Sequence, residues 1–445
     1  MDNIRATVLA ELQHALSTLQ SQPVPAQTLV VALSGGKDSV VLLDILYRIA
    51  GSEEDNPYKL PSLYAFHVNH GLSSEADDWM HHCSILCAHR NIPFESATVT
   101  LQSKPRISLE AQARELRYTR LLEFTKRKNG VLVTAHHLHD QVETMLLQLK
   151  RGAGPKGLGS MQAVSFRNEV PIIRPMLDVS QEAINQYAIT SKLSWVEDES
   201  NIDERFDRNF LRRQIIPLME ARWPAVSRAI SRSAQFCNEQ AQLLEQVSKE
   251  KLLSLQDAEN KLDVALLLDH SELWQKQILR EWLRQFFPLS PSSSVLLQIQ
   301  KMLIAKEGSQ PLVGIGEYSV RRFKGKLWCI NRFEHLPEHL PIPDTGVTLP
   351  VWGKRLNVDV AKDAQWDRGS LSLVTGLPSI KLRPVGKLHS KLFKEWLKEW
   401  EVPPWERIQV PLVFYNDSPV AVCLHNQIVA LQTPPTVPLL EFSYN

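Results

Sequence analysis

The segment Ser34-Gly35-Gly36-Lys37-Asp38-Ser39 constrains the fold of this 445-residue chain more than any other stretch. A β-branched apolar run at 29–33 precedes it, and an apolar stretch from Val40 follows it without a turn signal. This pattern predicts a buried parallel strand and a helix packed on it. The two glycines let the backbone turn sharply and approach a ligand with no Cβ in the way. The amides of residues 35–38 then converge at the positive end of the helix, which predicts a phosphate or pyrophosphate site.

Two better-known glycine loops do not fit this segment. A Walker loop requires glycine at position 31 and Ser or Thr at position 38, where this chain has Val31 and Asp38. The dinucleotide fingerprint Gly-x-Gly-x-x-Gly is absent from the segment. The pattern Ser-Gly-Gly-x-Asp-Ser after a strand resembles the loop of ATP pyrophosphatases, which split ATP into AMP and pyrophosphate. The alternative is an ordinary strand-to-helix turn capped by Ser or Asp.

Strands and helices alternate around this loop. Further apolar runs predict strands at 63–68, 94–101, 131–135 and 171–176. Amphipathic patterns predict helices at 1–22, 75–90 and 108–127. The alternation predicts an α/β fold with a doubly wound parallel sheet, and such sheets bind ligands at the carboxyl ends of their strands.

The rest of the chain changes character twice. Residues 1–218 are the predicted ATP-binding catalytic domain, and residues 219–335 are predicted to be mainly helical, with a hairpin at 318–330. The proline-rich stretch 336–369 is predicted to be a linker. Residues 370–445 are predicted to form a small α+β domain.

The composition indicates the cellular compartment and the kinds of partner to expect. The chain is 43% hydrophobic and 22% charged, as is typical of soluble globular proteins. No run approaches the ~18 apolar residues of a membrane span, and Asp2 and Glu11 interrupt any secretory leader. Cys83 and Cys87 lack the second cysteine pair that a zinc or iron–sulfur site needs. We therefore expect reduced thiols, a cytoplasmic location and no membrane partner.

Polar residues with catalytic potential gather after the fourth predicted strand. The stretch 134–144 contains three histidines, Asp140 and Glu143, and its position near the ATP loop favours catalysis. Asp140 and Glu143 also have the spacing of a capping pair, so capping alone is the alternative. Zinc is a weaker alternative, because no second ligand cluster has suitable spacing.

The predicted helix 108–127 carries a polar edge beside its buried stripe. Glu110, Arg114 and Arg117 recur at helical spacing and therefore share that edge. A salt bridge between Glu110 and Arg114 on a solvated face is the alternative, and spacing alone favours it.

Basic residues cluster although the net charge is only +1. The loop 150–159 has four glycines and three cations, residues 208–232 hold six arginines and one acid, and residues 381–407 hold seven cations and four glutamates. Such clusters are typical of nucleic-acid binding, or of solvated helix faces. Phe393, Trp396, Leu397 and Trp400 form a stripe, called the aromatic stripe after its three rings. These rings suit stacking on RNA bases; the alternative is that the stripe is part of a core.

Together these motifs resemble those of bacterial tRNA(Ile)-lysidine synthetases over most of the chain. The first motif indicates only the superfamily, but the set and its order are specific. The resemblance rests on segments 34–39, 67–72, 110–118, 135–144, 150–154, 174–175, 198–201, 208–212 and 402–412.

The resemblance implies an enzyme that joins free L-lysine to carbon 2 of the wobble cytosine in isoleucine tRNA with a CAU anticodon. ATP adenylates the cytosine oxygen and releases pyrophosphate, and the lysine ε-amine then displaces AMP. The modified tRNA reads AUA instead of AUG and changes identity from methionine to isoleucine. The family also suggests a homodimer.

The resemblance assigns residues to three roles. ATP binding, with Mg²⁺ on Asp38, is expected from Ser34, Gly35, Gly36, Lys37, Asp38, Ser39, Val68 and Asn69. Catalysis, including charge stabilisation and lysine activation, is expected from Asp38, Arg114, Arg117, His137, Asp140 and Glu143. Contacts with tRNA are expected from Lys150, Arg151, Lys156, Arg208, Arg212, Arg383, Lys391, Lys394 and Arg407.

The chain departs from the family pattern at one position. The family typically has two adjacent acids where this chain has His139 and Asp140, which makes His139 a candidate substitute for the missing acid. A tRNA cytidine thiolase and a GMP-synthetase-type enzyme are the rival enzymes, but no cysteines are placed for sulfur transfer or for a glutaminase. The rival from another class is a non-catalytic RNA-binding relative.

Overall fold

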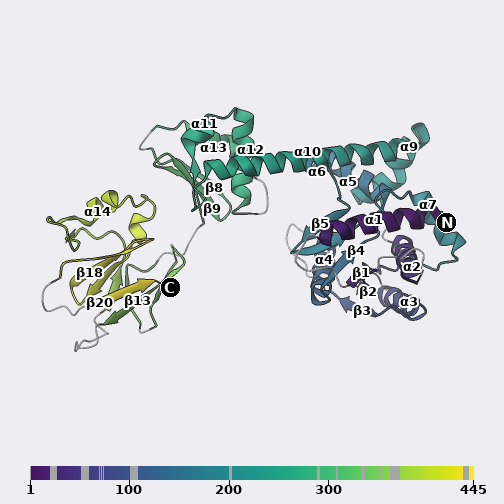
Figure 1. Ribbon diagram of the computed structural model, residues 1–445, viewed down its shortest axis with the longest axis horizontal. Coiled ribbons are helices and arrows are strands. Elements are labelled where there is room, and N and C mark those ends of the chain that lie inside the picture. The colour runs from purple at the N-terminus through teal and green to yellow at the C-terminus, as the bar shows by residue number, and fades with distance from the viewer. Residues whose placement is uncertain are drawn as a thin grey trace. The chain divides into compact units, whose positions relative to one another are not determined.

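The computed structural model divides into two compact units, Met1–Gln246 and Val247–Asn445 (Figure 1). The structure describes residues 2–20, 28–51, 60–69, 71, 73, 75–100, 109–199, 203–287, 291–306, 309–331, 336–343, 345–350, 352–360, 371–433 and 440–444. The motif residues His70, Leu72, Ser200 and Asn201 lie outside this set, as does the side chain of Glu110.

The first unit is built on a six-stranded sheet. Its strand order is β3 (Phe94–Thr98), β2 (Ser62–Asn69), β1 (Thr28–Ala32), β4 (Gly130–Val133), β6 (Val170–Ile173) and β5 (Val164–Arg167). Every neighbouring pair is parallel except β5 with β6. The predicted doubly wound parallel sheet is confirmed. Strand β5 was not predicted, because this short edge strand has no long apolar run.

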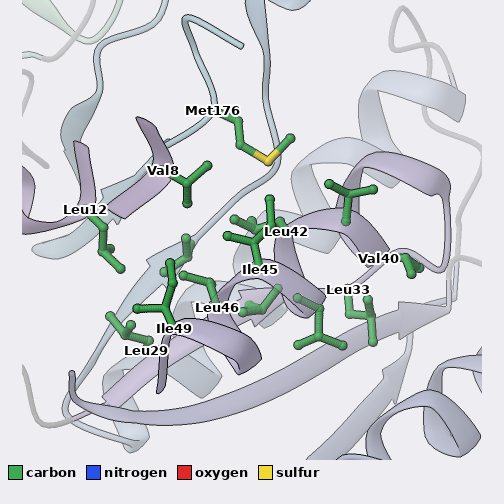
Figure 2. Close-up of a cluster of buried hydrophobic side chains, with 14 of the residues drawn as sticks. Val8, Leu12, Leu29, Leu33, Val40, Leu42, Ile45, Leu46, Ile49 and Met176 are labelled. Carbon is green, nitrogen blue, oxygen red and sulfur yellow. The ribbon is translucent and has the colours of Figure 1, made fainter. Parts of the chain in front are cut away.

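Helices cover both faces of this sheet. On one face lie α1 (Asp2–Gln20), α2 (Lys37–Gly51), α3 (Ala76–Ala88) and α7 (Gln181–Thr190), whose apolar side chains form one core with β1. Figure 2 shows this core, in which Val8 and Leu12 of α1 lie near the side chains of α2. On the other face α4 (Leu109–Arg127) packs on Val30 and Leu132. Alternate residues of β1 thus face opposite cores, as expected for a central strand buried on both sides.

The topology places two loops together at one sheet edge. From β1 the chain builds outward to β2 and β3, then crosses to β4 on the other side of β1. The loop after β1 and the loop after β4 therefore leave neighbouring carboxyl ends in opposite directions. Ligands of open α/β sheets bind at such switch points.

Short helices complete the first unit. They are α5 (Leu138–Lys150), α6 (Pro155–Leu158), α8 (Asp207–Phe210), a π-helical turn η2 (Leu211–Ile215) and α9 (Ile216–Arg222). Pro217 lies in the first turn of α9, where a residue without an N–H is tolerated. The amide of Ile216 donates to the carbonyl of Leu211, which is the bonding pattern of a π-helical turn. The 30-residue helix α10 (Val226–Leu255) crosses the division between the units.

The second unit begins with helices on a small sheet. The helices are α11 (Val264–Leu268), α12 (Glu272–Arg284) and α13 (Ser293–Leu303), and the strands run in the order β7 (Leu262–Asp263), β10 (Lys326–Asn331), β9 (Tyr318–Phe323) and β8 (Leu312–Ile315). Trp282 and Ile278 of α12 are buried in their common core. The predicted hairpin is confirmed as β9 and β10, which pair antiparallel.

The C-terminal part of this unit contains two further sheets and a strand pair. The strands are β11 (His339–Pro341), β12 (Val347–Leu349), β13 (Lys354–Val360), β14 (Leu371–Val374), β15 (Lys381–Leu382), β16 (Lys391–Leu392), β17 (Leu412–Tyr415), β18 (Ser418–Cys423), β19 (Ile428–Ala430) and β20 (Leu440–Tyr444). The helical elements are α14 (Phe393–Glu399) and the 3-10 turn η4 (Arg407–Gln409).

The prediction of a linker over 336–369 is wrong for its described part. It contains β11, β12 and β13, and Leu349 and Leu356 lie in the same core as β14. Proline content misled the prediction, since Pro341 lies in β11, which is an edge strand of its sheet. Edge strands tolerate a residue without an N–H.

Gly35 provides a test of the loop geometry. Its φ is +88°, and a Cβ there would lie 3.0 Å from Val196 Cγ2 and 3.1 Å from Cys83 Sγ. We expect Gly35→Ala to lower the unfolding free energy of the first unit by about 1–3 kcal/mol, because a non-glycine residue is strained in this conformation. Urea unfolding, followed by hydrogen exchange of the α2 amides, measures the effect.

Gly36→Ala is the matched control. The nearest atom to its Cβ would be Ser34 Oγ at 3.4 Å, so we expect a change below about 1 kcal/mol. Equal losses in the two variants would contradict the proposed strain at Gly35.

Candidate active site

Side-chain and backbone hydrogen bonds fix the loop between β1 and α2. Ser39 Oγ donates to the carbonyl of Gly36 at 2.9 Å and accepts from the amide of Ser34 at 3.2 Å. Ser34 Oγ accepts from the amide of Gly36 at 3.3 Å. The amide of Val196 donates to the carbonyl of Gly35 at 3.0 Å. These bonds leave the first amides of α2 at the sheet edge, where a helix N-terminus favours an anion.

Asp38 lies in the first turn of α2 and faces two other elements. Its Oδ2 is 3.6 Å from His137 Nε2, and Gln181 Nε2 at the start of α7 donates to Oδ1 at 3.3 Å. Burial opposes ionisation, but the contacts with His137 and Gln181 outweigh it and lower the pKa of Asp38. Asp38 is therefore a carboxylate at neutral pH.

His137 is the N-cap residue of α5. Its amide donates to Asp140 Oδ2 at 3.0 Å, and its Nδ1 accepts from the amide of His139 at 3.2 Å. Because Nδ1 is an acceptor, the proton of the neutral ring lies on Nε2, which is 3.5 Å from Asp140 Oδ2 and 3.6 Å from Asp38 Oδ2. Burial disfavours the imidazolium, but the two carboxylates outweigh it and raise the pKa of His137.

Asp140 is held as a carboxylate by the charges around it. Burial opposes ionisation, but His137, His136, Arg208 and Arg212 outweigh it and lower the pKa of Asp140 to about 2. Two carboxylates from different loops therefore flank one imidazole.

Glu143 of α5 is wholly buried and joined to two arginines. Arg208 Nε donates to Oε2 at 2.8 Å, and Arg212 donates from Nε to Oε1 at 2.6 Å and from Nη2 to Oε2 at 3.1 Å. Arg212 Nη2 also lies 3.2 Å from Asp140 Oδ1. We predicted tRNA contacts for both arginines and lysine activation for Glu143. The structure brings the three residues together in one network that ties α8 and η2 to α5.

The other predicted ATP and catalytic residues occupy varied environments. Arg114 is exposed and Arg117 is half-buried, both on α4. Val68 lies in the core beneath α4.

The amide of the Asn69 side chain donates to Asp77 at 2.7 Å, and its oxygen accepts from the amide of Gly71 at 2.9 Å. Asn69 therefore closes the turn after β2. The Lys37 ammonium lies 5.9 Å from the centre of the Trp195 ring.

Most of the predicted tRNA-binding residues lie at the surface of their own unit. In the first unit Arg151 is exposed, while Lys150 pairs with Asp207 at 2.7 Å and Lys156 with Glu245 at 2.8 Å.

In the second unit Arg383, Lys391 and Lys394 are exposed, and Arg407 is half-buried with its Nε donating to the carbonyl of Val402. Phe393 and Trp396 are at most 2% exposed. The aromatic stripe therefore forms a core, and these two rings are not a stacking surface.

His136 is a histidine of the motif for which no role was predicted. Its Nδ1 is 2.8 Å from Thr134 Oγ1. Burial lowers the pKa of His136 to about 3, and the positive charges of Arg174 and Arg208 act in the same direction, against the opposing effect of Asp140. The three histidines in the motif could have indicated it, but spacing does not show which ring is buried.

His139 is paired with an acid. Its Nε2 lies 2.8 Å from Glu220 Oε1, which also accepts from the Ser227 hydroxyl. This chain therefore has a histidine–glutamate contact between α5 and α9 at the position where the family pattern has an acid.

Comparisons with known proteins decide between the rival enzyme families. A PP-loop domain matches residues 8–219, a TilS substrate binding domain matches 262–328, and a TilS substrate C-terminal domain matches 371–426. The tRNA(Ile)-lysidine synthase of Photorhabdus laumondii is 36% identical over 91% of this chain and 91% of its own length. That of Histophilus somni strain 129Pt is 37% identical over 92% of this chain and 97% of its own length.

The chain belongs to the tRNA(Ile)-lysidine synthase family. It is an ATP-using enzyme of the PP-loop type, and the predicted resemblance is confirmed. Among solved structures, the U34-tRNA thiolase NcsA from Methanococcus maripaludis aligns with 53% of this chain and 79% of its own at 16% identity and a TM-score of 0.44. None of the described helices combines the length and apolar character needed to cross a membrane.

Removal of the Glu143 charge tests the network with Arg208 and Arg212. We expect Glu143→Gln to lower the unfolding free energy of the first unit by about 1.5–3 kcal/mol, because two partly exposed guanidinium groups lose their charged hydrogen-bond acceptor. Glu123→Gln removes an exposed ion pair with Arg120 on α4 and should cost less than about 1 kcal/mol. Urea unfolding of both variants measures the difference, and similar losses would contradict the network.

His136 gives a pH-dependent prediction. An unfolded histidine binds its proton below a pKa of about 6.5, whereas folded His136 does so only near 3. The unfolded state therefore binds more protons between these values, and this group's contribution to stability falls as the pH drops from 6.5 towards 3. We expect imidazole NMR signals that stay neutral at pH 5, assigned by their loss in His136→Gln. A half-protonated ring at pH 6 would contradict the prediction.

Proposed function

We propose that this protein forms lysidine at the wobble cytidine of isoleucine tRNA with a CAU anticodon, using ATP and free L-lysine. The main support is that Asp38 from the predicted ATP loop and Asp140 both lie close to the His137 imidazole. The chain also aligns with a lysidine synthase over 91% of its length. With ATP and tRNA as substrates, we propose a cytoplasmic location. A homodimer is proposed on the family resemblance alone.

The first step transfers AMP to the cytosine oxygen. Carbon 2 of cytosine is a urea-like carbonyl, and its oxygen leaves poorly until it is adenylated. The proposed site for the β- and γ-phosphates is the loop at residues 34–39, whose amides and hydroxyls suit phosphate oxygens. We assign Arg114 and Arg117 to the charge that develops on the α-phosphate, an effect typically worth several kcal/mol.

Asp38 is the proposed Mg²⁺ ligand. Within the described residues no group of three or more His, Cys, Asp or Glu side chains is arranged to hold a metal ion. This fits Mg²⁺, which proteins often bind through one or two carboxylates together with substrate phosphates. Asp38 supplies an ionised carboxylate within the phosphate loop. When bound, Mg²⁺ would neutralise phosphate charge.

The second step needs the lysine amine near the adenylated base. Free lysine has a side-chain pKa of ~10.4, so it arrives as an ammonium and must lose a proton. We assign ammonium binding to Asp140, which is ionised. Glu143 is less suited, because both of its oxygens accept from arginines. His137 is the proposed positioning residue, since its Nε2 lies between the two carboxylates.

Basic residues outside the site are the proposed tRNA contacts. They are Lys150, Arg151 and Lys156 in the first unit and Arg383, Lys391, Lys394 and Arg407 in the second. Arg208 and Arg212 are proposed to support the site through Glu143. The target base must leave its stack to reach the adenylating site.

Incorporation of labelled lysine tests the proposed function. Unmodified isoleucine tRNA with a CAU anticodon should take up label in the presence of ATP and Mg²⁺, and methionine tRNA, which shares this anticodon, should not. No label in either tRNA, with the protein folded and bound to both, would refute the enzymatic proposal and leave an RNA-binding relative.

Asp38→Asn tests the role of the loop carboxylate. We expect kcat for lysidine formation to fall about 10²–10³-fold, the scale on which single charge-stabilising groups act, with a thermal midpoint close to that of the parent protein. Glu123→Gln, far along the chain from the loop and exposed, should retain the parent rate. Parent-like kcat in Asp38→Asn would contradict the assignment.

A further inference from the structure

Arg174 is a buried arginine with an unused donor. It follows β6 at the carboxyl edge of the sheet and is only 8% exposed. Its Nη1 donates to the carbonyl of Gln162 at 2.8 Å and to Ser165 Oγ at 2.9 Å. Its Nε has no hydrogen-bond partner in the part of the chain that the structure describes. A buried donor without a partner costs free energy unless a ligand satisfies it.

The backbone places Arg174 beside the candidate active site. The amide of Thr134 after β4 donates to the carbonyl of Ile173 at 3.0 Å. Two residues beyond Arg174, Met176 forms a parallel bridge with His137. The segment with Arg174 thus runs next to the segment with His136 and His137.

Further cations lie near Arg174 on α4. The Tyr118 hydroxyl is within hydrogen-bond reach of Arg174, and the Arg114 guanidinium lies 6.0 Å from the centre of the Tyr118 ring. Arg117 is next to Tyr118 in the chain. Burial and the positive charge of Arg114 lower the pKa of both Arg117 and Arg174.

Within the described side chains, this cluster has no ion pair of the kind that other arginines in the unit form. Arg208 and Arg212 are paired with the buried carboxylate of Glu143. Among the ion pairs of the described residues, none involves Arg114, Arg117 or Arg174. Cations gathered without an ion-pair partner among the described residues favour an anionic ligand, and the planar guanidinium fork matches the oxygens of a phosphate.

We propose that Arg174, together with Arg117 and Arg114, forms a phosphate-binding subsite of the active site, in which the Arg174 guanidinium donates to a phosphate oxygen. The proposal rests on the proposed function and adds Arg174 as a ligand-binding residue. The phosphate belongs either to ATP or to the RNA backbone beside the target base, and these two sources share the chemistry that the subsite recognises.

Arg174→Met tests the subsite, because it removes the charge and the donor while keeping an unbranched side chain. Arg167→Met is the matched control, since Arg167 lies 4.9 Å from the centre of the same Tyr118 ring but pairs with Glu115 at the surface. Thermal midpoints report folding. Arg117→Met, at a half-buried position, provides the same test if Arg174→Met fails to fold.

Two binding measurements distinguish the phosphate sources. The first is the affinity for isoleucine tRNA as a function of salt, without ATP. The second is the affinity for a non-hydrolysable ATP analogue, without tRNA. Neither binding measurement requires turnover, so both test the subsite even if the protein forms no lysidine. A failure of the proposed function would be detected separately, in the lysine-incorporation assay.

We expect Arg174→Met to lower the affinity for one of the two ligands by 10-fold or more. The control, Arg167→Met, should change the affinity for either ligand by less than two-fold. If the subsite binds an RNA phosphate, the variant should bind tRNA more weakly, and the slope of log affinity against log salt concentration should be smaller by about 1. Binding of the ATP analogue should then be unchanged. An ATP phosphate predicts weaker analogue binding, with tRNA unchanged. Parent-like affinity for both ligands in a folded variant would overturn the proposal.

Discussion

The site depends on the contact of two carboxylates with one imidazole. Asp38 begins α2 and Asp140 begins α5, and both lie within 3.6 Å of His137 Nε2. Two negative charges this close would disfavour each other's ionisation without a proton between them. The Nε2–H of His137 supplies that proton, and its orientation follows from the backbone bond to Nδ1. Because β1 and β4 are neighbours, this contact joins the loop proposed to bind ATP to the loop proposed to bind lysine.

The arginines of the first unit are held in two different ways. Glu143 neutralises Arg208 and Arg212 and attaches the segment before α9 to α5. A carboxylate buried this completely is stable only while both partners remain. Around Tyr118, by contrast, Arg114, Arg117 and Arg174 have no such partner among the described residues. The first arrangement is neutralised within the protein, and the second is the proposed site for a phosphate of the substrate.

Local patterns in the sequence predicted the sheet, its central strand and the loop residues, because apolar periodicity and glycine spacing reflect local backbone geometry. They could not predict which side chains meet across elements. A capping pair of Asp140 and Glu143 was the alternative to catalysis, but Asp140 forms a capping box with His137. The partners of Arg208 and Glu220 lie 65 and 81 residues away, beyond any periodic signal. Prolines misled the analysis at β11, because local composition does not show that a strand lies at an edge.

Trapping the adenylated tRNA tests the central claim that Asp38 and Asp140 serve different steps at one imidazole. Isoleucine tRNA would be incubated with α-labelled ATP, Mg²⁺ and lysine, and bound label separated on acidic gels. The account predicts that Asp140→Asn accumulates adenylated tRNA because lysine no longer completes the second step, whereas Asp38→Asn forms almost none. If both variants stop before adenylation, or both accumulate the intermediate equally, the division of roles is wrong.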